Sequence, residues 1–333
     1  MAGITIAYLS GPDVDALAMA DDEILAAVES GLAAQGRKET TIEPRMHLVP
    51  DPAVDGHFNV LRGAIRPRRL AGVKVVGDFH GNYRHNLPSE MGLVCLFDST
   101  TGTPKAVLDA TAITAMRTGA VTALGAKHLA RQDARVLGHI GARGSAYWNV
   151  RLIAHLFELA EIRVHSRRPE SQAAFAAELR RDLGRDIVVT DDWRSCLEGA
   201  DIMVEASRLN TPEPLLKTAW IKQGALVIPY GTKSAVEITL TDAMDKIVVD
   251  DWGQARIGPL GALRAHVDSG RLSKANLHGE LCEIVAGLKP GRERSDETIL
   301  FWHRGLSLSD IALADAMLTK ARRMGIGHTL PYA

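Results

Sequence analysis

Three cationic side chains in the first third of the chain, Arg45, Lys74 and Arg117, are candidates for binding an anionic group. Isolated arginines are more often surface or helix-face residues, but Lys74 lies within the apolar run from Gly72 to Val76. An ammonium buried among valines costs free energy unless an opposite charge offsets the loss of water. Lys74 therefore points either into a pocket that receives a substrate anion or toward a buried carboxylate, and we expect the pocket.

A glycine-rich turn in the middle of the chain has the composition of a phosphate-binding loop. It leads from an apolar strand into a helix and reads Gly141-Ala142-Arg143-Gly144-Ser145-Ala146. Backbone N–H groups at such a turn, together with the helix dipole, bind the pyrophosphate of a dinucleotide. Arg143 stands at the second glycine of the G-x-G-x-x-A pattern, where it either obstructs the phosphate or contacts it. We assign all six residues to cofactor binding; the alternative is an ordinary strand–turn–helix connection.

The next predicted strand ends in the polar run Ser166-Arg167-Arg168. NAD sites place an acidic residue here for the ribose 2′-hydroxyl, whereas serine followed by arginine suits a 2′-phosphate. NADP(H) is therefore favoured over NAD(H), with Ser166, Arg167 and Arg168 as cofactor-binding residues. The alternative is a solvent-exposed basic turn.

The size and composition of the chain exclude several classes of protein. Its 333 residues suffice for two domains, each with its own core. A net charge of -1, with 46% hydrophobic and 24% charged residues, favours neither nucleic acid nor an anionic membrane as a partner. The three cysteines, Cys95, Cys196 and Cys282, are widely spaced, so we expect no disulfide framework and no metal site. Because no secretion signal or spanning segment is apparent, we expect a cytoplasmic protein.

The order of the predicted elements indicates an α/β protein with two domains. Helices are predicted over residues 21–35 and 111–129, and strands over 71–79, 91–97 and 106–108. We expect these elements to form an α+β domain for substrate binding and dimerisation over residues 1–130, completed by residues 305–333 with a helix at 309–324. Residues 131–304 alternate short apolar strands with helices, which predicts a Rossmann doubly wound parallel sheet that binds NADP. Its strands are expected at 135–140, 162–165, 187–189, 201–206, 225–229 and 246–249.

Several of these segments together resemble the ornithine cyclodeaminase/μ-crystallin family over nearly the whole chain. The matching motifs are Gly72–Val76, Leu87–Glu90, Leu96–Asp98, Asp109–Thr118, the glycine turn, Gly279–Leu281 and Lys289–Gly291. The resemblance implies a homodimer whose first domain supplies the dimer interface and the substrate pocket. It also implies that Arg45, Lys74 and Arg117 hold the substrate carboxylate near the nicotinamide, with Lys74 donating a hydrogen bond or a proton. Thr118, at the end of its motif, is placed among the cofactor-binding residues.

One position departs from the family pattern. Members that cyclodeaminate ornithine carry an aspartate in a Gly-x-Asp context after the fifth Rossmann strand, whereas this chain has Gly231-Thr232-Lys233. The change removes a general base and reverses the local charge, which disfavours ornithine cyclodeamination. Lys233 either binds substrate or pairs with Glu205 or Asp201 at neighbouring strand ends. The glycine turn and residues 301–305 are also similar to a branch of the family named for tyramine oxidase, although the sequence shows no quinone or copper chemistry.

Together these features predict an NADP(H)-dependent imine (ketimine) reductase or amino-acid dehydrogenase that acts on a small amino acid, imino acid or amine. Hydride would move between the nicotinamide and the carbon that bears nitrogen, while the protein supplies orientation and anion binding. One alternative is a cyclodeaminase-type ammonia lyase that recycles its nicotinamide. Another is a non-catalytic accessory protein that keeps the cofactor, an interpretation suggested by Arg143 and Lys233.

Overall fold

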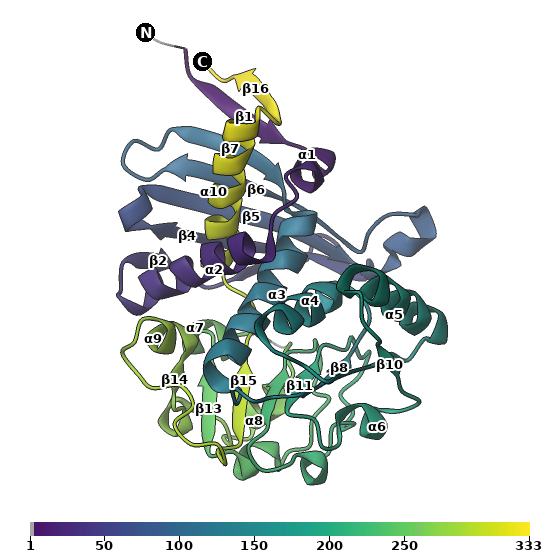
Figure 1. Ribbon diagram of the computed structural model, residues 1–333. Coiled ribbons are helices and arrows are strands. Elements are labelled where there is room, and N and C mark those ends of the chain that lie inside the picture. Colours follow the sequence, from purple (N-terminus) through teal and green to yellow (C-terminus); the bar gives the residue numbers. More distant parts are fainter. Residues whose placement is uncertain (1–2, 259) are drawn as a thin grey trace. The chain divides into compact units, whose positions relative to one another are not determined.

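The computed structural model describes residues 3–258 and 260–333, except for the side chains of His80 and Tyr83. The chain divides into two compact units, Met1–Arg117 with Leu306–Ala333, and Thr118–Gly305 (Figure 1). The division falls within helix α3 (Ala110–Leu129), earlier than the expected boundary at residue 130. A continuous helix gives no break in its apolar pattern, so the sequence placed the boundary at the end of the helix.

The first unit is built on an eight-stranded sheet. Its strand order is β16-β1-β7-β6-β5-β4-β2, and β3 pairs with β4. All neighbouring strands are antiparallel except β1 and β7, which are parallel. The strands are β1 (Thr5–Leu9), β2 (Thr40–Ile42), β3 (Met46–Leu48), β4 (Gly56–Ile65), β5 (Leu70–Phe79), β6 (Glu90–Asp98), β7 (Pro104–Asp109) and β16 (His328–Pro331).

Helix α10 (Ser307–Met324) lies along one face of this sheet, over β4, β5 and β6, and also packs against α2 (Asp21–Gly36) (Figure 1). The close approach depends on small residues: a Cβ at Gly72 of β5 would lie 2.8 Å from Cγ1 of Ile311. Along β5, alternate side chains face α10, which places Leu70, Lys74 and Val76 on the covered face and leaves Val75 exposed. This unit also contains α1 (Gly11–Ala16), the first part of α3 as far as Arg117, and short 3-10 helices at Arg66–Arg68 and His80–His85.

The second unit contains the expected doubly wound sheet. Its eight strands are all parallel, in the order β10-β9-β8-β11-β12-β15-β13-β14. The chain runs outward from β8 through β9 to β10, then returns to the other side of β8 for β11 and β12, so the switch point lies between β8 and β11. The strands are β8 (Val136–Ile140), β9 (Glu161–His165), β10 (Val188–Val189), β11 (Ile202–Glu205), β12 (Leu226–Pro229), β13 (Lys246–Val249), β14 (Gly279–Glu280) and β15 (Ile299–Trp302).

Two strands of this sheet were not predicted from the sequence, β14 and β15. Strand β15 lies between β12 and β13 and is completely buried. An isolated four-residue apolar run after a charged loop has no periodicity that distinguishes strand from helix. Besides the larger part of α3, the helices of this unit are α4 (Ala146–Leu156), α5 (Pro169–Leu183), α6 (Trp193–Leu197), α7 (Trp252–Ala255), α8 (Arg264–Asp268) and α9 (Leu281–Val285), with 3-10 helices at Thr218–Trp220, Leu240–Ala243 and Lys274–Asn276.

Candidate functional site

Lys74 and Arg117 meet at a buried carboxylate in the first unit. The Lys74 Nζ atom on β5 and the Arg117 Nε atom on α3 each lie 2.8 Å from the same oxygen of Asp310, Oδ1, on α10. Lys74 also donates to the hydroxyl of Thr114 at 3.2 Å. All three charged side chains are at most 7% exposed. Of the two partners that the sequence allowed for Lys74, the described residues supply the buried carboxylate, which offsets part of the cost of removing the ammonium from water.

The cluster formed by Lys74, Arg117 and Asp310 carries an excess of positive charge. Burial and the charge of Arg117 lower the pKa of Lys74 from 10.5 to about 8, while Asp310 opposes the shift. The charge of Arg45, on the segment between β2 and β3, lowers the pKa of Lys74 further, so this third predicted cation lies within electrostatic reach. The second oxygen of Asp310, Oδ2, is buried and has no hydrogen-bond partner among the described residues. One carboxylate thus faces two buried cations, an arrangement that favours a further anion nearby.

Asp310 is the residue of this cluster that the sequence analysis missed. It stands 236 positions from Lys74, so no local spacing connects them. A weak signal was present, because Asp310 interrupts a helix segment in which Leu308, Ile311 and Ala312 are all buried. An aspartate on the buried side of a helix needs a charged or hydrogen-bonding partner.

The glycine turn lies where β8 ends and α4 begins, at the switch point of the second sheet. Gly141 has a φ of 106°, and a Cβ there would lie 2.7 Å from the carbonyl oxygen of Ala206. Gly144 also has a positive φ, and Ser145 is the N-cap residue of α4. Arg143 and Gly144 are exposed, and the Arg143 side chain makes no ion pair with a described residue. The turn therefore presents glycine backbone, a serine hydroxyl and a helix N-terminus to a ligand, which fits a pyrophosphate.

In the polar run after β9, the two arginines are exposed and Ser166 is half-buried. The Ser166 backbone N–H donates to Oε1 of Gln172 at 2.9 Å, which fixes the start of this loop. Arg167 and Arg168 are exposed, and neither makes an ion pair with any residue that the structure describes. Both guanidinium groups are thus available to a ligand, although the same exposure fits a solvated basic turn.

The structure places two further predicted residues in the second unit. The carbonyl of Thr118 accepts a hydrogen bond from the Thr122 hydroxyl at 3.0 Å. Lys233, in the loop after β12, is half-buried. The suggested pairing of Lys233 with a strand-end carboxylate is not seen among the described residues.

Those two carboxylates have other partners. Asp201 pairs with Arg131 at 2.5 Å and with Lys222 at 2.7 Å. Glu205 accepts from the Ser207 and Gly231 backbone N–H groups, and burial raises its pKa to about 7. Within the described residues, neither strand-end carboxylate is therefore the partner of Lys233.

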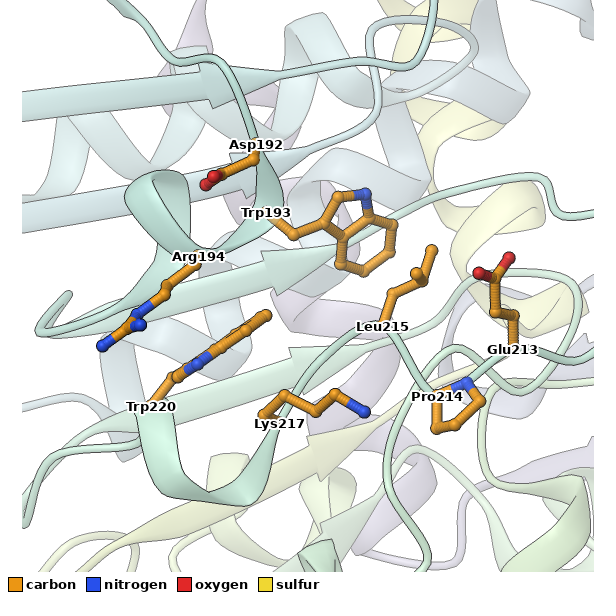
Figure 2. A pocket seen from close by; sticks show the side chains of 8 residues that line it. All are labelled: Asp192, Trp193, Arg194, Glu213, Pro214, Leu215, Lys217 and Trp220. Carbon is orange, nitrogen blue, oxygen red and sulfur yellow. The ribbon is translucent and has the colours of Figure 1, made fainter.

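A surface cavity of about 540 Å³ lies beside α6 (Figure 2). Figure 2 shows the rings of Trp193 and Trp220 and the side chain of Leu215 around it, with charged groups at its rim. None of the predicted cofactor- or substrate-binding residues lines this cavity. The described residues contain no group of three or more metal-ligating side chains, and no helix among them is long and apolar enough to cross a membrane.

A family model described as the ornithine cyclodeaminase/mu-crystallin family matches residues 7–324. The chain belongs to this family. Among curated proteins, alanine dehydrogenase of Archaeoglobus fulgidus is 28% identical over 321 residues, which cover 93% of this chain and 94% of the relative. The family expected from the motifs is therefore confirmed.

Two solved structures are similar over almost their whole length. Thermococcus litoralis Δ1-pyrroline-2-carboxylate reductase in complex with NADH and L-proline has a TM-score of 0.90 and 27% identity, with 97% of this chain and 99% of that chain covered. An archaeal alanine dehydrogenase dimer with bound NAD has a TM-score of 0.90 and 27% identity, with 99% and 100% covered. The expected fold is confirmed, as is the expected class of oxidoreductase that acts on a C–N bond.

Proposed function

We propose that this family member is a nicotinamide-dependent imine reductase or amino-acid dehydrogenase whose substrate carries a carboxylate. The observation that carries the proposal is the excess positive charge of the cluster at Lys74. Two buried cations share one carboxylate oxygen, and a third cation lies near enough to lower the pKa of Lys74. A substrate carboxylate would balance this charge, as carboxylates do when guanidinium and ammonium groups converge on them.

Each residue of the cluster has a distinct task in this proposal. Arg45 and Arg117 bind and orient the substrate carboxylate. Lys74, with a pKa of about 8, holds a proton close to neutral pH and donates it or a hydrogen bond to the substrate. Asp310 positions Lys74 and Arg117, which reach it from β5 and α3. A bound nicotinamide would supply the hydride, and the chain would supply orientation and charge.

For the cofactor we propose NADP(H), bound through its pyrophosphate to residues 141–146 and through its 2′-phosphate to Ser166, Arg167 and Arg168. Support comes from the exposure of both arginines directly after β9 and from the absence of an acidic residue at Ser166. The two solved relatives carry NADH and NAD. The affinities of the protein for NADPH and for NADH, measured side by side, therefore test this part of the proposal.

We also propose a homodimer formed through the uncovered face of the first sheet. Met46, Val60, Val75 and Leu93 are neighbours across β3, β4, β5 and β6. Met46, Val75 and Leu93 are 55%, 39% and 47% exposed. A row of apolar side chains on an otherwise uncovered sheet face is typical of an interface, and one solved relative is a dimer.

The reaction is tested by following cofactor consumption during incubation with small 2-oxo acids plus ammonia or methylamine, and with cyclic imino acids. A reductase oxidises one NAD(P)H for each amino acid formed. A lyase of the cyclodeaminase type releases ammonia with no net change in the cofactor, and an accessory protein does neither. The lysine at position 233, in place of the family aspartate, favours the reductase. Ammonia release from ornithine without net cofactor consumption would overturn the proposal.

A further inference from the structure

A chain of polar groups runs through the second unit from β8 to the glycine turn. The Nδ2 atom of Asn149 on α4 lies 2.9 Å from Nε2 of His139 on β8 and 2.5 Å from the hydroxyl of Tyr230, which follows β12. The Tyr230 hydroxyl is also 2.7 Å from Oγ of Ser145, the N-cap residue of α4. His139 and Asn149 are completely buried. The chain of contacts therefore ends at a residue of the predicted pyrophosphate site.

The direction of the hydrogen bonds between His139, Asn149 and Tyr230 follows from one carbonyl group. Nδ1 of His139 lies 3.0 Å from the Gly141 carbonyl oxygen, which only accepts, so Nδ1 carries a hydrogen. Burial lowers the pKa of His139 to about 4, so the ring is neutral and its Nε2 accepts. The amide nitrogen of Asn149 must then face His139, and its second hydrogen is donated to the oxygen of Tyr230.

The last link concerns the two hydroxyl groups. The Tyr230 oxygen accepts from Asn149, which leaves its own hydrogen able to point to Oγ of Ser145 at 2.7 Å, and the proposal takes this direction. With its oxygen accepting from Tyr230, the Ser145 hydroxyl can donate its hydrogen to a ligand at the turn. A phosphate oxygen is an acceptor only, so this polarity suits an anionic ligand.

The ring of Tyr230 is held in place by a second contact. Its centroid lies 4.4 Å from that of His303, which follows β15, and the ring planes meet at 32°. The Thr122 hydroxyl donates to the carbonyl of Thr118, so it accepts from Nε2 of His303 at 3.0 Å. Tyr230 is thus held both at its hydroxyl and at its ring, which keeps its oxygen beside Ser145.

We propose that Tyr230 is a positioning residue for the dinucleotide, because it orients the Ser145 hydroxyl as a donor to the pyrophosphate. Tyr230 does not itself touch the cofactor in this proposal. It links the loop after β12 to the turn after β8 through Ser145 and Asn149. The inference rests on the proposed binding of a dinucleotide at residues 141–146.

The test is a double-mutant cycle on dinucleotide affinity. Tyr230→Phe keeps the ring against His303 and removes the hydroxyl, and Ser145→Ala removes the group that it orients. The Kd of NADPH and of NADH is measured by fluorescence titration for the wild type, both single variants and the double variant. We expect each single variant to weaken binding by about tenfold. Since the two residues act through one hydrogen bond, the double variant should bind no more weakly than Ser145→Ala alone.

A matched control removes another tyrosine hydroxyl from the same unit. The Tyr147 hydroxyl on α4 bonds to Asp182 at 2.8 Å and to Arg151 at 3.0 Å, away from the turn. Tyr147→Phe should leave both dinucleotide affinities unchanged. For a positioning role, Tyr230→Phe should raise the KM for the dinucleotide and leave kcat nearly unchanged at saturation.

The outcomes separate this inference from the proposed function. If the wild type binds neither dinucleotide, the proposed function fails. If the wild type binds and Ser145→Ala weakens binding while Tyr230→Phe does not, the inference alone is overturned. Additive effects in the double variant would also overturn it, because independent contributions exclude action through Ser145. Should Tyr230→Phe fail to fold, the Asn149→Ala variant tests the same chain of hydrogen bonds. Asn149→Ala should then weaken dinucleotide binding in the wild type but not in the Ser145→Ala background.

Discussion

Replacement of Lys74 by methionine should separate a functional lysine from a structural one. The pKa of Lys74 falls from 10.5 to about 8 in the folded protein, first because of burial and then because of Arg117. One pKa unit corresponds to about 1.4 kcal/mol, so keeping this ammonium charged at neutral pH costs the fold about 3 kcal/mol. Methionine has a similar length and no charge, and Arg117 would still neutralise Asp310. Lys74→Met should therefore be as stable as the wild type at neutral pH, or more stable.

The wild type and Lys74→Met should also differ in how their stability depends on pH. Between about pH 8 and pH 10.5 the unfolded chain keeps a proton on Lys74 that the folded chain has released. The unfolded state binds more protons in this window, so the contribution of Lys74 to stability rises with pH through it and levels off above it. Lys74→Met lacks this rise. The free energy of unfolding, measured in urea for both proteins across this window, checks the difference.

Lys74→Met should lose turnover even though it keeps or gains stability. Without the ammonium, the substrate lacks the proton or hydrogen bond that Lys74 is proposed to donate, so Lys74→Met should keep its dinucleotide affinity and lose most of its turnover. Lys74→Arg restores the charge but not its shape, and should not restore activity. A methionine variant that unfolds several kcal/mol more easily and yet turns over at the wild-type rate would refute this reasoning and show that Lys74 is a structural ion-pair partner.

Four further substitutions test the remaining assignments. In a fluorescence titration, Arg167→Ala should weaken NADPH binding by about tenfold or more and leave NADH binding unchanged. As a control, Arg181→Ala at the other end of α5 should change neither affinity. Equal losses of affinity for both cofactors would contradict a 2′-phosphate contact. Asp310→Asn leaves Lys74 and Arg117 buried without their counter-charge. It should therefore lower the free energy of unfolding by about 3–5 kcal/mol in urea denaturation and lower the pKa of Lys74 further. An unchanged free energy of unfolding would show that the two cations are solvated. Lys233→Asp reverses the charge after β12, so the ratio of kcat/KM for basic imino acids to kcat/KM for dicarboxylic imino acids should rise by about tenfold. An unchanged ratio would show that Lys233 does not contact the substrate. Leu93→Glu should give a monomer in light scattering if the uncovered sheet face is the dimer interface, while Leu288→Glu, at an exposed position of the second unit, should not.

The second unit was the more predictable part of the fold. Strands such as β11 and β12 are buried on both faces, so they appear in the sequence as short continuous apolar runs between turns. In the first unit, β4 was missed although it is ten residues long. Most of its residues are only half-buried, so apolar and polar side chains do not alternate cleanly along it. Burial on both faces made most strands of the second unit visible in the sequence, but it was not sufficient, because β15 is also completely buried and was missed.

Candidate site residues could be recognised from the sequence when they lie in one short segment, and were missed when their role depends on partners that lie far away in the sequence. The glycine turn lies within six consecutive residues, and Lys74 is conspicuous among valines. Asp310 and Tyr230 act only through partners on other strands and helices, at sequence separations of 236 and 85 residues. No spacing rule reaches that far, because such contacts follow from strand order and helix packing.

The charge of the cluster at Lys74 argues for a ligand rather than for stability. A lysine that served only to neutralise Asp310 would have its pKa raised by that carboxylate, yet here burial and Arg117 outweigh it and lower the pKa to about 8. Arg117 lies at the same distance from the same oxygen and could neutralise Asp310 alone. The second cation is therefore unfavourable for the folded chain by itself. Residues that reduce stability in this way are commonly kept for function, and the function that two converging buried cations serve best is the binding of an anion.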